Sequence, residues 1–184
     1  HTERYAEHDR ETFNETLDAA QKLAEERFAP HAMRLDANEP MVDGERVQLI
    51  PEVGAAINAY IESGFMGLMA ETQYGGMQMP WSVAQAACAY FSAADVTVNA
   101  YPFLTQSAIN LLAEFGSEEQ KKRYLEPMVQ GRFFGTMCLS ESQAGSSLSD
   151  IQVRAERTEG EHFLIKGTKM WISAGEHELA ENIV

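Results

Sequence analysis

The spacing of apolar residues changes near Gly131, and this change constrains the fold more than any other feature of the sequence. Before it, apolar residues recur every three or four positions, which is typical of helices that bury one face. After it, short apolar or alternating runs lie between polar turns, which is typical of strands. We therefore predict an α+β chain, with an N-terminal all-α helical bundle over residues 1–132. The first strands of a β-barrel or sandwich domain should follow over residues 133–184.

Five helices are predicted in the bundle, and prolines and glycines mark most of their ends. The first should end at Pro30, where a polar loop begins, because proline does not continue a helix. The second should begin at Pro51 and end at Gly64, and the fourth should follow Pro102. The apolar side of the fourth helix is expected to be buried, and it comprises Ala108, Leu111, Leu112 and Phe115.

The fifth predicted helix has the clearest start. Ser117 and Gln120 have the spacing of a capping box, in which each side chain bonds the backbone amide of the other residue. The buried face of this helix should comprise Tyr124, Leu125, Met128 and Val129.

Composition narrows the range of partners. The chain carries 14 Lys and Arg against 28 Asp and Glu, a formal net charge of −14. Nucleic acid and anionic membranes require clustered cations, so neither is expected as a partner. No apolar run is long enough to span a membrane. Cys88 and Cys138 stand alone in apolar surroundings, which indicates buried thiols in a reducing cytoplasm.

Two further features of the sequence are the spacing of its histidines and its last residues. The five histidines show no metal-ligand spacing and are expected at the surface, and no metal site is predicted. The last residues, Asn182-Ile183-Val184, look like the start of a strand. We therefore expect the sequence to be a truncated piece of a longer protein.

A small polar loop follows the apolar run over residues 133–139. It begins at Ser140-Glu141 and continues through Ala144-Gly145-Ser146-Ser147. Further along, Trp171 and Ser173 lie on a segment that resembles a strand, where residues i and i+2 face the same side. Together, hydroxyls, backbone amides and an indole can hold a flat heterocycle that carries phosphates. Taken singly, each feature is more often an ordinary turn or a half-buried tryptophan.

The motifs and their order resemble those of the acyl-CoA dehydrogenases, from about residue 65 to residue 172. The segments that carry the resemblance are Tyr74-Gly75-Gly76, residues 116–125, Met137-Cys138-Leu139-Ser140-Glu141, Ala144-Gly145-Ser146 and residues 167–173. Ser142 and Ala174 stand where the family usually has proline and asparagine. The run over residues 173–183 looks like the bacterial branch that includes 3-methylmercaptopropionyl-CoA dehydrogenases.

The resemblance implies an FAD-dependent enzyme that oxidises the Cα–Cβ bond of an acyl-CoA thioester. It implies that Trp171 lies against the isoalloxazine, that Ser173 lies near flavin N5, and that Ser146 also meets the CoA side of the substrate. The full set of implied cofactor-binding residues is Met137, Leu139, Ser140, Gly145, Ser146, Trp171, Ile172 and Ser173.

The resemblance also bears on catalysis and partners. The family's catalytic glutamate lies in a C-terminal domain, so no catalytic residue is assigned here, and the chain alone is expected to be inactive. Glu141 is expected to be a structural partner of its loop. Electron-transfer flavoprotein is the implied electron acceptor, and the full-length protein is expected to be a homodimer or homotetramer.

Two alternatives remain open. An acyl-CoA oxidase or a related flavin monooxygenase would use the same scaffold for different chemistry. A non-catalytic helical interaction module would keep the loop without binding the cofactor.

Overall fold

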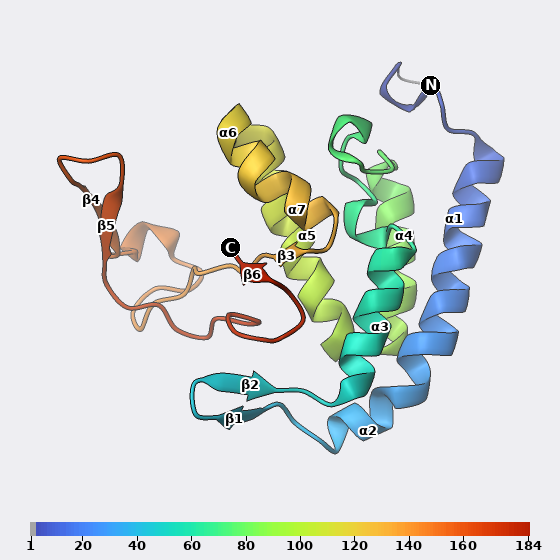
Figure 1. Cartoon of the computed structure of the whole chain (residues 1–184), viewed down its shortest axis with the longest axis horizontal. Coiled ribbons are helices and arrows are strands. Elements are labelled where there is room, and N and C mark those ends of the chain that lie inside the picture. Colours follow the sequence, from blue (N-terminus) through green and yellow to red (C-terminus); the bar gives the residue numbers. More distant parts are fainter. Residues whose placement is uncertain (1–2) are drawn as a thin grey trace.

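Four long helices pack together in the first part of the chain (Figure 1). The structure is a computed structural model that describes residues 3–184, so His1 lies outside the described residues. The long helices are α1 (Arg10–Leu23), α3 (Pro51–Glu62), α4 (Trp81–Ala94) and α5 (Val96–Phe115). The shorter helices are α2 (Ala32–Asp36), α6 (Glu118–Gln120) and α7 (Glu126–Val129), and 3-10 turns cover Glu3–Tyr5, Phe65–Gly67 and Thr72–Tyr74.

An aromatic cluster fills the centre of the bundle. The ring centroid of Phe91 lies 5.1 Å from that of Phe28, 4.9 Å from that of Tyr60 and 5.1 Å from that of Phe65. These residues come from different elements, and all are buried. Tilted and edge-on aromatic contacts of this kind add specific geometry to the burial of apolar area. The predicted helical bundle is therefore confirmed.

The first helix does not end at Pro30 as predicted. After α1 the chain continues through a π-helical turn (Ala24–Phe28), a 3-10 turn (Ala29–His31) and α2. Pro30 lies in the first turn of the 3-10 segment, where a missing amide hydrogen costs nothing. The sequence analysis also missed the antiparallel hairpin of β1 (Met41–Asp43) and β2 (Arg46–Gln48), whose strands are too short and too exposed to show a clear alternation.

The second helix has the predicted ends. Pro51 is the first residue of α3, and Gly64 follows its last turn with a φ of +78°, in the left-handed region that favours glycine. The fourth predicted helix, in contrast, begins six residues before Pro102, since α5 starts at Val96. The Asp95 side chain caps α5 by accepting hydrogen bonds from the amides of Thr97 and Val98.

The predicted apolar side of α5 is only partly buried, because Ala108 and Leu112 pack half-buried against the core. Leu111 and Phe115 are 58% and 78% exposed, whereas Tyr101, Thr105 and Ile109 are buried. Apolar residues occupy both sides of this helix, so their spacing alone could not show which side packs inward.

The start of the fifth helix is confirmed. The Ser117 hydroxyl accepts a bond from the Gln120 amide at 3.2 Å, and the Gln120 side chain accepts one from the Ser117 amide at 2.9 Å. The helix continues from α6 through a π-helical turn (Lys121–Leu125) into α7. Leu125, Met128 and Val129 are buried as predicted, whereas Tyr124 is only half-buried.

The second part of the chain contains strands in two-stranded sheets and no closed barrel within residues 133–184. Strand β3 (Phe133–Phe134) pairs in parallel with β6 (Asn182–Ile183), which brings the end of the described chain back to the helices (Figure 1). Strands β4 (Arg154–Arg157) and β5 (Phe163–Lys166) form an antiparallel hairpin that extends away from the bundle. A 3-10 turn covers Leu148–Asp150. The predicted α+β class, a helical bundle followed by first strands, is confirmed.

Two segments that the sequence indicates as strands differ in the structure. Only Phe133–Phe134 of the run over residues 133–139 is a strand. Residues 170–172 form no strand, because Trp171 has a φ of +59°, outside the β region.

Gly135 sets the distance between the strand segment and the helical bundle. Its amide donates a hydrogen bond to Thr105 Oγ1 at 3.2 Å. A Cβ placed at this position would lie only 2.5 Å from the Cβ of Ala108. The backbone of residue 135 therefore lies directly against α5, and the segment that follows starts from this contact.

We expect Gly135→Ala to lower the free energy of unfolding by about 1–3 kcal/mol, because the added methyl group must push α5 away. Gly54→Ala is the matched control: its Cβ would meet nothing nearer than 3.9 Å, and alanine favours the interior of α3. The control should be neutral or stabilising by up to about 1 kcal/mol. Urea unfolding of the two variants measures the difference, and equal stability would contradict the close contact.

Candidate flavin site

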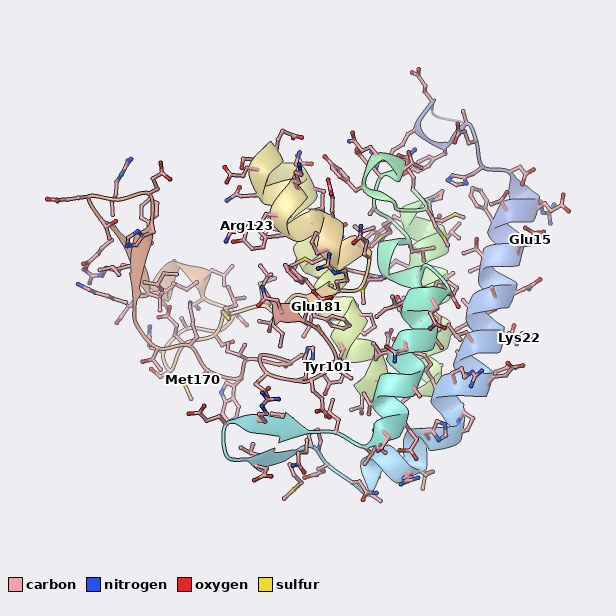
Figure 2. The ribbon with its side chains drawn as sticks, in the orientation of Figure 1. Glu15, Lys22, Tyr101, Arg123, Met170 and Glu181 are labelled. Atoms are coloured by element: carbon pink, nitrogen blue, oxygen red, sulfur yellow. The ribbon has the colours of Figure 1, made fainter. Side chains whose placement is uncertain are left out.

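The two predicted cofactor segments lie side by side in the structure. The amide of Met170, labelled in Figure 2, donates a hydrogen bond to the Ser140 carbonyl at 2.9 Å. The Thr136 hydroxyl donates to the Ser173 carbonyl at 2.5 Å. Residues 136–140 therefore run antiparallel to residues 170–173, although neither segment is a regular strand. Trp171 directly follows Met170, so the pairing places the backbone of Trp171 next to that of Ser140.

Large apolar side chains in these two segments are only partly covered. Trp171 is 85% exposed and Met137 is 52% exposed, and Leu139 is also exposed. Ile172 is half-buried and Ser173 is exposed. The expectation that Trp171 and Ser173 share one face of a strand is not met, since the left-handed backbone at Trp171 interrupts the alternation. The exposed indole nevertheless offers a flat apolar surface next to polar backbone.

The loop that follows Ser140 offers hydrogen-bond donors. Reciprocal bonds between Glu141 and Ala144, at 2.8 and 3.2 Å, close the turn. Within residues 3–184, the amides of Gly145 and Ser146 donate to no protein acceptor. A Cβ at Gly145 would meet nothing within 4 Å. Free amides beside open space form a suitable site for the oxygen atoms of a phosphate.

The serine hydroxyls of the two segments are also available. In the described part of the chain, the Oγ atoms of Ser140, Ser146 and Ser173 have no hydrogen-bond partner in the protein. These groups fit a ligand that combines a flat ring, polar ring edges and phosphates.

Glu141 holds the loop in place. The residue is 8% exposed, and its carboxylate accepts bonds from Lys169 Nζ at 2.8 Å and from the amides of Gln152 and Val153 at 2.8 and 3.1 Å. The bond from Lys169, followed by those from the two amides, lowers the pKa of Glu141 to about 2. Glu141 is therefore ionised and fully engaged, as expected of a structural partner.

Lys169 is a site residue that the sequence analysis missed. Besides Glu141, its ammonium group contacts the Leu139 carbonyl at 2.9 Å, so it links the two paired segments. Its place directly before Met170 and Trp171, in a chain with few cations, was the available signal. Two other expectations are wrong: Cys138 is exposed and Cys88 is only half-buried, and His177 is buried.

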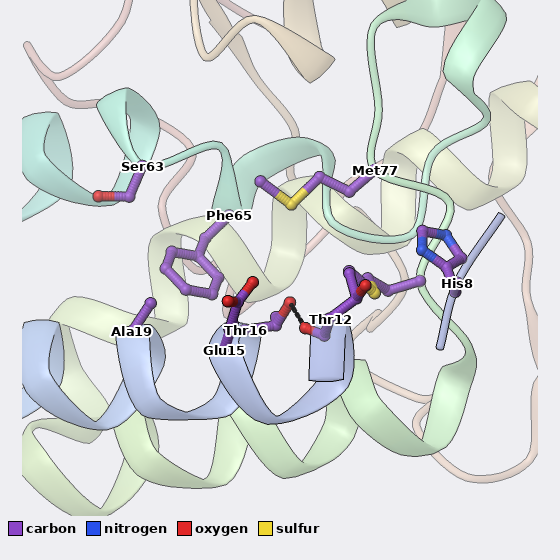
Figure 3. Close-up of a pocket in the computed structure, with 9 residues that line it drawn as sticks. His8, Thr12, Glu15, Thr16, Ala19, Ser63, Phe65 and Met77 are labelled. Carbon is purple, nitrogen blue, oxygen red and sulfur yellow. Dashed lines mark hydrogen bonds between the residues drawn. The ribbon is translucent and has the colours of Figure 1, made fainter. Parts of the chain in front are cut away.

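A cavity of about 430 Å³ lies elsewhere, between α1 and the connection that follows α3 (Figure 3). Phe65, Met77 and Thr16 are among the residues that line it. None of the predicted site residues lines this cavity, so the cavity is no part of the candidate site.

Across residues 3–184 there is no group of three or more His, Cys, Asp or Glu placed to hold a metal ion. No helix in that range has the length and apolar content needed to cross a membrane.

Solved structures share the overall fold of this chain. The chain is similar to a chain of the electron transferring flavoprotein structure from Acidaminococcus fermentans, with a TM-score of 0.75 and 25% identity over 95% of this chain and 41% of that one. It is also similar to glutaryl-CoA dehydrogenase from Mycobacterium smegmatis, with a TM-score of 0.74 and 27% identity over 90% of this chain and 40% of that one. The fold is therefore one that this chain shares with acyl-CoA dehydrogenase structures.

Sequence comparison identifies the family. Residues 10–132 match the family described as "Acyl-CoA dehydrogenase, N-terminal domain". The 3-methylmercaptopropionyl-CoA dehydrogenase of Ruegeria pomeroyi is 34% identical over 180 residues, which cover 98% of this chain and 31% of that protein. The chain belongs to the acyl-CoA dehydrogenase family, and it spans about a third of the length of the curated relatives it matches.

We expect Glu141→Gln to destabilise the protein at neutral pH, because one carboxylate oxygen would become an NH2 group. That group would face either Lys169 and the Val153 amide or the Gln152 amide and the Gln143 side chain, all of which are donors. The pKa of Glu141 is lowered, so its stabilising effect is complete above pH 4.5 and is lost as the pH falls towards about 2. The difference in unfolding midpoint between wild type and variant should therefore shrink over that range.

Glu156→Gln is the control for this measurement, because Glu156 pairs with Lys166 on the exposed face of the β4–β5 hairpin. Exposed pairs contribute little, so its effect should be small at every pH. Equal behaviour of the two variants would show that Glu141 does not hold the loop.

Proposed function

We propose that the protein containing this chain is an FAD-dependent acyl-CoA dehydrogenase that acts on the Cα–Cβ bond of an acyl-CoA thioester. The observation that carries the proposal is the antiparallel pairing of residues 136–140 with residues 170–173, through the Ser140 carbonyl and the Met170 amide. This pairing gathers an indole, three serine hydroxyls and a loop with free amides. Family membership supports the same reading.

The proposed roles of the residues follow from their chemistry. Trp171, with Met137, Leu139 and Ile172, would offer apolar surface to the isoalloxazine ring. The hydroxyls of Ser140 and Ser173 would bond the polar edge of the ring. The amides of Gly145 and Ser146 would receive the pyrophosphate, and Ser146 would also meet the CoA side of the substrate. FAD, when bound, would supply the acceptor for the hydride that leaves Cβ.

No catalytic base is proposed among the described residues of the site. Glu141, with a pKa lowered to about 2 and its oxygens already bonded, is a poor proton acceptor. We propose a division into a helical domain over residues 1–132 and a partial β-domain over residues 133–184. The base would come from another part of the full-length protein. That protein would use electron-transfer flavoprotein as its electron acceptor, and would work in the cytoplasm as a homodimer or homotetramer.

The full-length protein should bind FAD, and Gly145→Val should weaken that binding about tenfold or more, because a branched side chain would block approach to the loop amides. Ser149→Val is the control, since it adds the same side chain at an exposed position beyond the loop. Titration of the deflavinated full-length protein with FAD, followed by visible absorbance, measures both.

Three results would count against this function. A full-length protein that stays colourless and binds neither FAD nor acyl-CoA would favour a non-catalytic interaction module. Rapid reaction of the reduced flavoprotein with oxygen would favour an oxidase or monooxygenase. Equal FAD affinity in the two valine variants would remove Gly145 from the site.

The 184-residue chain alone should show no acyl-CoA-dependent reduction of an electron acceptor, because the proposed base would come from another part of the full-length protein. A dye-reduction assay with short-chain, thioether-bearing and long-chain acyl-CoAs tests this, with the full-length protein as the positive control. Turnover by the chain alone would show that the base lies within it.

A further inference from the structure

His177 is buried in a segment that is otherwise largely exposed. Of residues 173–184, all described, it is the only one that is fully buried, at 5% exposure. Its ring lies edge-on to Tyr101 of α5, with 5.1 Å between centroids and 87° between planes. It lies 5.2 Å from Phe134 of β3, at 76°. One imidazole therefore fills the junction between the helical bundle and the first strand.

The hydrogen bonds of the ring fit a neutral imidazole. Nδ1 accepts a bond from the Leu179 amide at 3.2 Å, so the proton of a neutral ring lies on Nε2. Nε2 is buried and has no partner in the described part of the chain. Burial lowers the pKa of His177 below its ordinary value of 6.5, and the charge of Glu176 opposes this effect only partly. A second proton on the ring would displace the Leu179 amide and would be a buried charge among aromatic rings.

The buried ring lies four residues after Ser173, whose carbonyl bonds Thr136. Residues 182–183 of this segment also pair with β3 as strand β6, and Ala174, Leu179 and Ala180 pack partly buried against the core. Two further ties are at the surface. The Glu176 carboxylate accepts a bond from the Val47 amide of β2, and Arg132 pairs with Glu181 at 2.8 Å (Glu181 is labelled in Figure 2). Exposed pairs of this kind contribute little to stability. His177 is therefore the one fully buried side chain between Ser173 and β6, and it attaches the segment that follows Trp171 and Ser173 to α5 and β3.

We propose that His177 is a positioning residue for the cofactor segment: its neutral ring, inserted between Tyr101 and Phe134, holds residues 170–173 against residues 136–140, and protonation of the ring releases them. The proposal rests on the proposed function, because it is the flavin that these segments would contact. His177 itself would touch neither flavin nor substrate.

The expected pH dependence has a definite sign. The docked segment requires a neutral ring, so docking is complete above pH 6.5 and weakens as the pH falls below that value. Two titratable groups face the ring: Tyr101 from α5 and Glu176 from its own segment. From β3 only the uncharged Phe134 reaches it. The pKa of Tyr101 is raised by burial, so Tyr101 stays neutral throughout this range.

The test uses the full-length protein and two variants of His177. His177→Phe keeps an aromatic ring between Tyr101 and Phe134 but cannot be protonated, whereas His177→Ala removes the ring. Hydrogen–deuterium exchange of peptides covering residues 168–183, corrected for intrinsic rates, reports docking with or without FAD. FAD affinity is measured in parallel, from the physiological range down to about one unit below pH 6.5. His162→Ala, at an exposed histidine beside the β4–β5 hairpin, is the control.

We expect His177→Ala to raise exchange in these peptides about tenfold and to weaken FAD binding by a similar factor. His177→Phe should keep exchange low and should lose the pH dependence that wild type shows. The proposal is overturned if His177→Ala exchanges like wild type or like His162→Ala. It is also overturned if His177→Phe is as disturbed as His177→Ala, or if wild type shows no change below pH 6.5. Exchange is measured in the protein without FAD, so it tests the role of His177 even if no FAD binds. Failure of the proposed function would instead appear as an absence of FAD binding by wild type.

Discussion

The candidate site depends on the hydrogen bonds that the Glu141 carboxylate accepts. This group is nearly buried and bonds Lys169, the amides of residues 152 and 153, and the side chain of Gln143. It therefore joins three stretches of chain that have almost no regular secondary structure between them. A loop without strand or helix bonds needs such a centre, because its backbone groups have few other partners. The amides of Gly145 and Ser146 follow the closed turn and donate to no acceptor in the described part of the chain.

The helical bundle contributes position. The Gly135 backbone lies against α5, and the Thr105 hydroxyl, itself buried, bonds the Gly135 amide. Close contact of this kind leaves little freedom, since packed interiors do not deform smoothly. The segment with Ser140 begins at this contact, and the segment with Ser173 is followed by His177 in the same junction. Helix α5 therefore positions both segments. It contacts Gly135, which precedes the first segment, and His177, which follows the second.

The sequence predicted features that depend on neighbouring residues and missed those that depend on distant contacts. The capping box at Ser117 and the left-handed Gly64 were predictable because their chemistry is local. The buried face of α5 was not, because Leu111 and Phe115 are as apolar as the residues that do pack inward. Burial of His177 and the Lys169–Glu141 bond were equally invisible, since each joins positions brought together only by folding. Only the family resemblance indicated that the two cofactor segments belong together. The alternation of apolar and polar residues could not predict it, because neither segment is a regular strand.

The backbone of Trp171 gives an independent reason to place function here. A bulky residue with a φ of +59° is strained, and such strain persists only where the surroundings impose it. Gly167 and Ala174 also have positive φ, so the segment is a series of bends and not a failed strand. Lys169, bonded to Glu141, holds one side of Trp171, and Ser173, bonded to Thr136, holds the other. Between these two attachments Trp171 is 85% exposed. Such exposure is unusual for the largest apolar side chain of a well-anchored segment. A strained, well-anchored backbone that presents an exposed aromatic surface fits a binding site better than it fits an ordinary turn.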